Sequence, residues 1–139
     1  MKYKLVIFDL DNTLVLTRPA AKIGYKQAIY YIAKMNGLDK SRDKLYHHWK
    51  RIIQPLLIEK EPEKRRFTYS LQILLNKHGL PDTYLQPALN LYEKEMLNNL
   101  KLVKGAKELL SSLNEAHLKI AVTTGSERSE ARKKLKSVG

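Results

Sequence analysis

The sequence predicts an α/β protein in which a Rossmann-like parallel sheet is interrupted by an inserted set of helices. Two mostly apolar runs, at residues 4–8 and 118–122, each lead into a polar turn. Between them, residues 18–100 carry apolar side chains at helical spacing. Continuous apolar runs are typical of parallel strands that are buried on both faces. The order of strand, helices, strand and helix therefore favours a parallel sheet with a helical insertion.

The first half of the insertion contains two helical stripes. The first helix is expected from Arg18, with Pro19 suited to its first turn and Gly37 to its end. Pro55 is expected to kink or end the second helix near its last turn. The apolar positions of the two stripes are Ala21, Tyr25, Ala28, Ile32 and Met35, followed by Leu45, Trp49, Ile52, Ile53 and Leu56.

Two further stripes complete a predicted four-helix region. Gly79 closes the third helix and Pro81 precedes the fourth. Most aromatic side chains lie on these helical faces, so we expect them to form a core rather than a ligand platform. The apolar positions are Phe67, Leu71, Leu74 and Leu75, then Leu85, Leu89, Tyr92, Met96 and Leu100.

The end of the chain returns to the α/β pattern. After Gly105 a short helix through Leu113 is expected to lead into the second strand. A last helix follows Ser126, with acids first and bases last, as the helix dipole favours.

Composition limits the class of protein. The 139 residues are 43% apolar and contain no cysteine, which fits one domain-sized unit without disulfides or thiolate metal sites. The start lacks the features of a signal peptide, and the apolar runs are too short to span a bilayer. We therefore expect a soluble cytoplasmic protein with no membrane partner.

The formal charge of +12 has three interpretations: solvated helix faces, steering of anionic substrates, or a nucleic-acid site. Lysine and arginine are interspersed with glutamate, as in "EKEPEKRR", which favours solvated faces over nucleic-acid binding. The adjacent His47, His48 and Trp49 face different directions on a helix, so we expect two surface histidines and one core tryptophan.

Two carboxylates, Asp9 and Asp11, directly follow the first strand in "FDLDNTL". Ligands of parallel sheets bind beyond the carboxyl ends of the strands, which is where these acids would lie. One acid of such a pair can attack as a nucleophile while the other transfers protons, with a hard divalent cation offsetting their repulsion. A simple polar turn explains Asp11 but not Asp9, because an acid ending an apolar strand needs a partner.

The second strand ends in "VTTGSE", which offers hydroxyl groups and free backbone N–H groups. Such a turn before a helix is a natural phosphate cradle. Ser126 as a plain helix N-cap is the competing explanation, and both interpretations can hold together.

These motifs resemble those of the haloacid dehalogenase superfamily. "FDLDNTL" resembles its first motif, Asp-x-Asp-x-Thr behind an apolar strand, and "KIAVTTGS" resembles its second. The resemblance spans essentially the whole chain and implies an α/β core at residues 1–17 and 101–139, with a helical cap at residues 18–100. Asn12 stands where many relatives have glycine.

The resemblance also implies roles for individual residues. Asp9 would form an aspartyl-phosphate and Asp11 would act as general acid and base, while Thr13 would support the turn. Mg²⁺ would be held by the Asp9 carboxylate and the Asp11 backbone carbonyl. The transferring phosphoryl group would be bound by Thr123 and by N–H groups near Thr124 and Gly125.

The expected activity is Mg²⁺-dependent hydrolysis of a small phosphorylated metabolite, because dehalogenases of the family lack the second aspartate. Two alternatives remain open: a phosphomutase with the same intermediate, and an inactive, basic helical binding module.

One departure from the family pattern concerns later motifs. The family needs a later lysine or arginine and a later acidic motif, but no acid follows Glu130. Lys133, Lys134 and Lys136 follow the second motif too closely to fit that role. We therefore expect a chain that ends after the second motif, is poorly active alone, and associates through an exposed sheet edge with another chain or a missing half.

Overall fold

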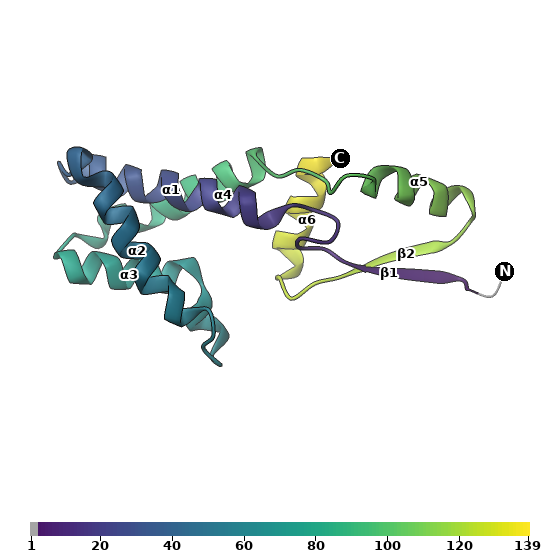
Figure 1. Ribbon diagram of the computed structural model, residues 1–139, viewed down its shortest axis with the longest axis horizontal. Coiled ribbons are helices and arrows are strands. Elements are labelled where there is room, and N and C mark those ends of the chain that lie inside the picture. Colours follow the sequence, from purple (N-terminus) through teal and green to yellow (C-terminus); the bar gives the residue numbers. More distant parts are fainter. Residues whose placement is uncertain (1–2) are drawn as a thin grey trace. The chain divides into compact units, whose positions relative to one another are not determined.

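The computed structural model describes residues 3–139 and divides them into two compact units (Figure 1). The core unit comprises the described residues up to Lys22 together with Met96–Gly139. The helical unit is Ile23–Glu95. The corresponding boundaries predicted from the sequence lie at 17/18 and 100/101. Among the described residues, no helix is both long and apolar enough to cross a lipid bilayer.

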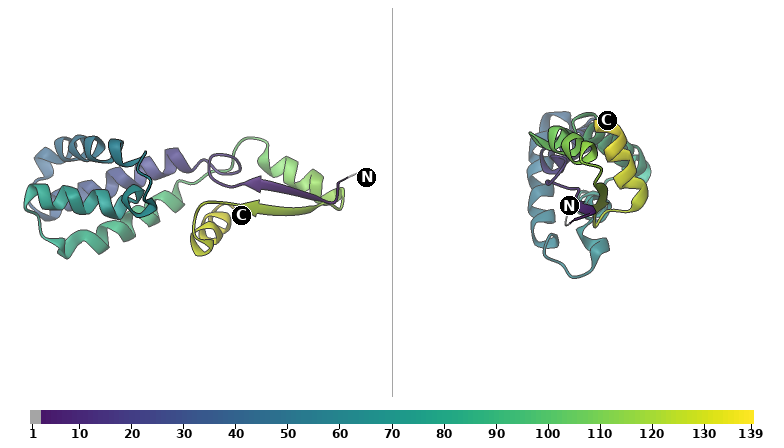
Figure 2. Two further views of the ribbon diagram at one scale, coloured as in Figure 1. Left: turned by 90° about the horizontal axis from the view of Figure 1, so that it is seen from below. Right: turned by 90° about the vertical axis from the view of Figure 1, so that its right-hand side faces the viewer.

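The core unit is built on a parallel sheet, as predicted. Strand β1 (Leu5–Asp9) pairs with β2 (Lys119–Thr123), and the register sets Asp9 opposite Thr123 at the carboxyl ends. The two strands run side by side in Figure 1 and in the left view of Figure 2. Helix α5 (Ala106–Glu115) packs against β2, and α6 (Arg128–Val138) follows it.

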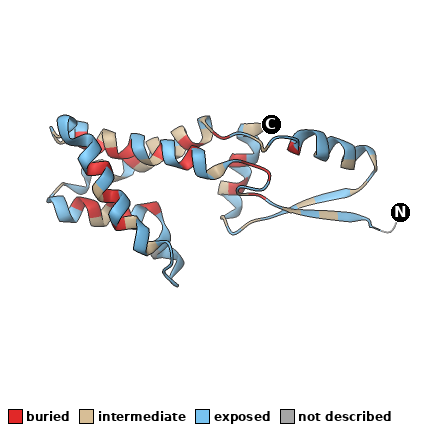
Figure 3. Ribbon diagram, in the orientation of Figure 1, coloured by how far each residue is buried: buried red, intermediate tan, exposed pale blue. Residues whose placement is uncertain are grey.

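The predicted burial of both strand faces is wrong for the described residues. Leu5 and Ile7 of β1 are 47% and 59% exposed, and Ile120 and Val122 of β2 are also exposed (Figure 3). The sheet formed by the described residues has two strands, so each strand has one neighbour. Strands of such apolar composition are typical of sheets whose two faces are covered by other elements, and the described part of this unit leaves these side chains exposed.

The turn after β1 is compact and well bonded. Leu10 is fully buried, and its carbonyl accepts hydrogen bonds from the N–H groups of Thr13, Leu14 and Val15. The segment from Leu14 then pairs with residues 101–103 through backbone hydrogen bonds. The turn that carries the two acids is therefore attached, through this pairing, to a segment that lies far away in the sequence.

The helical unit contains the predicted four-helix pattern. Helices α1 (Thr17–Met35) and α4 (Leu85–Asn98) continue into the core unit, and α2 (Arg42–Leu56) and α3 (Phe67–His78) lie within the helical unit. Pro55 lies in the last turn of α2, which ends one residue later at Leu56, as predicted. Gly79 caps α3 with a left-handed φ of 59°, as its position predicts.

An aromatic cluster fills the helical unit, which confirms the predicted core role of these side chains. Tyr25 stacks on Tyr92, and Phe67 meets the buried Trp49 edge to face. The Trp49 Nε1–H donates to Ser70 Oγ at 2.9 Å, so the buried indole nitrogen is satisfied.

Gly24 permits close packing of α1 against α4. A Cβ at this position would lie 2.7 Å from the backbone oxygen of Tyr92. A larger residue would force the two helices apart.

Candidate active site

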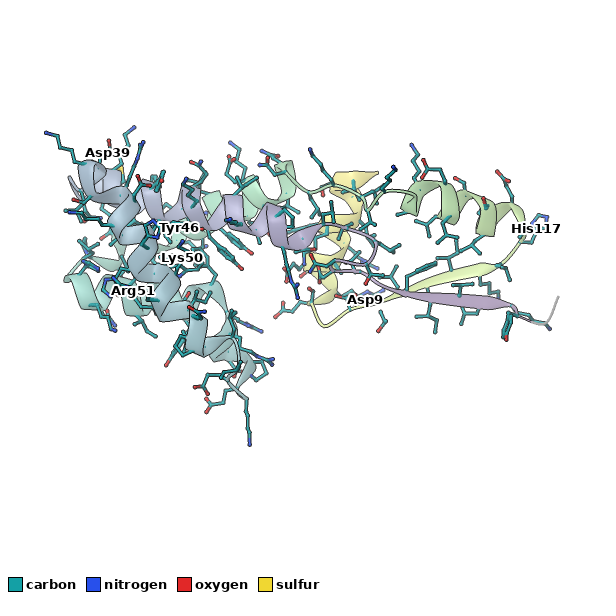
Figure 4. The ribbon with its side chains drawn as sticks, viewed as in Figure 1. Asp9, Asp39, Tyr46, Lys50, Arg51 and His117 are labelled. Atoms are coloured by element: carbon teal, nitrogen blue, oxygen red, sulfur yellow. The ribbon has the colours of Figure 1, made fainter. Side chains whose placement is uncertain are left out.

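Asp9 lies at the end of β1, where the strand gives way to the turn (Figure 4). Its exposed carboxylate accepts a hydrogen bond from Thr13 Oγ1 at 2.8 Å through one oxygen, Oδ2. The described residues give its other oxygen no hydrogen bond, and Thr123 is its register partner on β2. One oxygen of the Asp9 carboxylate is thus hydrogen-bonded, while the other is open to solvent.

Asp11 lies deeper and is bound by four side chains. Its Oδ1 accepts hydrogen bonds from Thr17 Oγ1 at 2.6 Å and from Lys134 Nζ at 2.8 Å. Its Oδ2 accepts from Ser126 Oγ at 3.0 Å and, weakly, from Thr124 Oγ1 at 3.4 Å. Two carboxylates that are two residues apart therefore have different environments.

Lys134 is a cation in direct contact with Asp11, although its position was predicted to be too close to the second motif for this role. Its side chain is only 3% exposed and also contacts Glu130 and Ser126, both at 3.3 Å. Side chains of a helix point toward its N-terminus, so a lysine two turns into α6 reaches back to the site. Ala131 and Lys134, three residues apart, are both buried and mark the inward face of α6.

The environment of Asp11 favours its charged form. Burial by itself raises the pKa of the Asp11 carboxyl, but the hydrogen bonds from Lys134 and Thr17, the charge of Lys134 and the bond from Ser126 together lower it below 3.8. Asp11 is thus a carboxylate at neutral pH in this arrangement.

The turn after β2 lies beside both acids. The Ser126 N–H donates to Thr124 Oγ1 at 3.1 Å, and the Ser126 hydroxyl donates to Asp11. The interpretation of Ser126 as the N-cap is wrong: Glu127 is the N-cap of α6, and no side chain caps it. Thr123 and Gly125 are exposed, and space is open around Gly125.

The comparison with protein families is decisive at this point. The family model described as haloacid dehalogenase-like hydrolase matches residues 3–139. The chain belongs to the haloacid dehalogenase-like hydrolases. No match was found among curated proteins.

Solved structures share this fold at low sequence identity. A protein described as a β-phosphoglucomutase, from Thermotoga maritima, is 19% identical with a TM-score of 0.64, and the match covers 97% of this chain and 56% of that one. A predicted phosphoglycolate phosphatase from Haemophilus somnus is 20% identical, with a TM-score of 0.60 and coverages of 100% and 59%. The hydrolase YfnB from Bacillus subtilis, bound to magnesium, is 18% identical, with a TM-score of 0.61 and coverages of 98% and 60%. The chain thus spans less than two thirds of the length of these structures.

Asn12, the departure from the glycine of many haloacid dehalogenase relatives, has a structural basis here. Its φ of 60° lies in the left-handed region, which asparagine tolerates better than most residues. Its Oδ1 also accepts a hydrogen bond from the Arg18 N–H at 2.9 Å, at the first turn of α1. Glycine would allow the turn but could not make this bond.

Several groups around Asp11 were missed by sequence reasoning. Thr17 and Lys134 were given no role, and Ser126 was considered only as a cap or as part of a phosphate cradle. The hydroxyl of Thr17, six residues after Asp11, has no motif around it that signals this contact. Chain folding alone brings Ser126 and Lys134 to Asp11.

Proposed function

We propose that this hydrolase is a Mg²⁺-dependent phosphatase that acts on a small phosphorylated metabolite through an aspartyl-phosphate. One observation carries the proposal: an exposed carboxylate, Asp9, ends a parallel strand, and a second, enclosed carboxylate follows two residues later. Different environments for two neighbouring acids support different roles in one reaction.

The proposed reaction has two steps. In the first, an Asp9 oxygen attacks phosphorus, the bond from phosphorus to the leaving oxygen breaks, and that oxygen takes a proton from Asp11. In the second, Asp11 takes a proton from water as the water oxygen attacks phosphorus. The bond from phosphorus to the Asp9 oxygen then breaks, which releases inorganic phosphate and restores the Asp9 carboxylate.

The contacts of Asp11 favour the protonation state that the second step needs, and the first step needs the other one. Lys134 and the hydroxyl of Ser126 stabilise the carboxylate form, which is the form that accepts a proton from water. The acid form needed for the first step is favoured when Asp11 turns away from Lys134. We propose that substrate entry accompanies this change.

The residues present fit a magnesium ion in part. The Asp9 carboxylate and the Asp11 backbone carbonyl are hard oxygen ligands, and Mg²⁺ commonly keeps several waters beside one or two carboxylates. The described residues contain no cluster of three or more potential ligands among histidine, cysteine, aspartate and glutamate. Bound Mg²⁺ would stabilise negative charge on the phosphoryl oxygens. Thr123, with N–H groups near Thr124 and Gly125, would hold those oxygens from the opposite strand.

The test is hydrolysis of p-nitrophenyl phosphate with and without Mg²⁺. We expect weak activity of the 139-residue chain that EDTA removes and that Asp9→Asn lowers to background, because the nucleophile is lost. Asp39→Asn, an exposed acid of the helical unit, is the matched control and should leave the rate unchanged. Retention of most activity by Asp9→Asn would exclude the assigned nucleophile.

A phosphomutase is the second candidate, favoured by the name of the Thermotoga maritima structure. The same aspartyl-phosphate would then be returned to a sugar instead of to water. Conversion of one sugar phosphate isomer into another without net phosphate release would select this function over hydrolysis.

A further inference from the structure

The helical unit contains a histidine pair that has no part in the proposed reaction. His48 comes from α2 and His78 from the last position of α3, and these two helices pack against each other (Figure 1). The His48 Nδ1 and His78 Nε2 atoms lie 2.7 Å apart, with the rings nearly perpendicular at 70°. Two imidazole nitrogens thus converge on one point from two helices.

We propose that His48 and His78 form a two-histidine chelate for a divalent transition-metal ion such as Ni²⁺ or Cu²⁺. With metal–nitrogen bonds of about 2.05 Å, two cis ligands at a right angle have nitrogens about 2.9 Å apart, and two tetrahedral ligands have nitrogens about 3.3 Å apart. The pair therefore needs to open by only a few tenths of an ångström to hold an ion in a square-planar or octahedral geometry.

Metal binding requires a change of tautomer but no net loss of protons. The hydrogen between the two rings moves to the far nitrogen of its own imidazole, so both rings stay neutral and both facing nitrogens offer lone pairs. His78 is exposed, so an ion can enter from solvent, while His48 is half-buried. The remaining coordination positions belong to water.

The local charge selects the class of ion. Arg51 and Lys77 are two of the groups whose charge acts on His48, and their positive charge disfavours any ion held by charge alone. The C-terminal end of α3, where His78 lies, favours a cation through the helix dipole. An ion that forms strong bonds to imidazole is therefore expected to bind, while Mg²⁺ and Ca²⁺, which prefer oxygen ligands, are not.

The test is calorimetric titration of the untagged 139-residue chain with Ni²⁺ at pH 7.5. We expect one Ni²⁺ ion at this pair, with affinity reduced at least tenfold in His48→Gln and in His78→Gln. The neighbouring, exposed His47 supplies the matched control, His47→Gln, which should bind as tightly as the unchanged chain. The melting temperature should rise with Ni²⁺ only in the chains that retain both His48 and His78.

Because His78 is exposed, His78→Gln is expected to fold normally, and far-ultraviolet circular dichroism checks this. No binding of Ni²⁺ by the unchanged chain would overturn the proposal. Equal affinity in all variants, or an equal loss in His47→Gln, would overturn it as well.

Discussion

The helices of the helical unit and the strands of the core unit differ in how far their apolar residues are buried. In the helical unit, Ile29, Leu71 and Leu74 are fully buried, and even the indole N–H of Trp49 has a partner. In the core unit, apolar strand residues such as Ile7 remain exposed, while a lysine is buried against Asp11.

This difference indicates which of the two units is stabilised mainly by its own contacts. The helical unit gains stability from apolar burial and satisfied polar groups. The core unit instead holds charged groups in an enclosed network, an arrangement that costs solvation free energy and is common at functional sites. Substitutions should therefore destabilise the helical unit most, and should affect chemistry in the core unit.

The largest effect is expected for Trp49→Ala. The variant removes a buried aromatic side chain from the cluster with Tyr25 and Phe67, and leaves Ser70 without its donor. We expect a loss of about 3–5 kcal/mol in the free energy of unfolding. Urea unfolding followed by circular dichroism measures it. A loss below about 1 kcal/mol would mean that the aromatic cluster does not hold the helical unit together.

A smaller loss is expected for Gly24→Ala. The new Cβ would meet the backbone of Tyr92, which cannot move without separating α1 and α4. Overpacking of this kind costs about 1–3 kcal/mol. Gly125→Ala is the control, since no atom lies within 4 Å of its Cβ position. Equal thermal stability of the two variants would argue against close packing at Gly24.

Lys134→Met should have a moderate effect that depends on pH. Its loss removes a charged hydrogen bond from Asp11, which we expect to lower the unfolding free energy by about 1–2 kcal/mol at pH 7. The folded pKa of Asp11 lies below 3.8, so its contribution is present above pH 3.8 and disappears as the pH falls through that lower value.

The difference between the unchanged chain and Lys134→Met should therefore shrink in acid. Unfolding curves at pH 7 and at about pH 2.5, without added metal, measure it. A difference that is the same at both pH values would show that Lys134 acts by packing rather than through Asp11.

The smallest effect on stability is expected for Ile7→Ser, on the exposed face of β1. We expect a change below about 1 kcal/mol, because the side chain is mostly in water. We also propose that the free edge of β1 pairs with a second copy of the chain in solution, with the exposed Ile7 side chain in that contact, since unpaired strand edges are templates for association. Light scattering should then give a mass above that of a monomer, and Ile7→Ser should reduce it. A monomeric unchanged chain at high micromolar concentration would contradict the association.

Sequence reasoning found the elements whose determinants are local. Apolar spacing predicted the separate stripes that include Ile32 and Leu74, and the left-handed cap at Gly79 followed from its position after α3. The same reasoning located the two acids at the end of β1, because a charged residue that ends an apolar strand is unusual.

Features that depend on distant parts of the chain could not be predicted in this way. Whether Ile7 is buried depends on how many neighbours β1 has, which its own pattern does not encode. The contact of Lys134 with Asp11 joins residues 123 positions apart, and the pairing of His48 with His78 depends on how α2 packs against α3. In each case, the missing information was tertiary packing.

The most direct test of the proposed function is capture of the phosphorylated intermediate on Asp9. The chain would be mixed with acetyl phosphate and Mg²⁺, quenched in acid, and its peptides analysed by mass spectrometry. We expect one phosphoryl group on the peptide that contains Asp9, labile to hydroxylamine, absent in Asp9→Asn and more abundant in Asp11→Asn, which lacks the base for hydrolysis. No phosphoryl group on this peptide in either the unchanged chain or Asp11→Asn, or a group that persists in Asp9→Asn, would contradict the account.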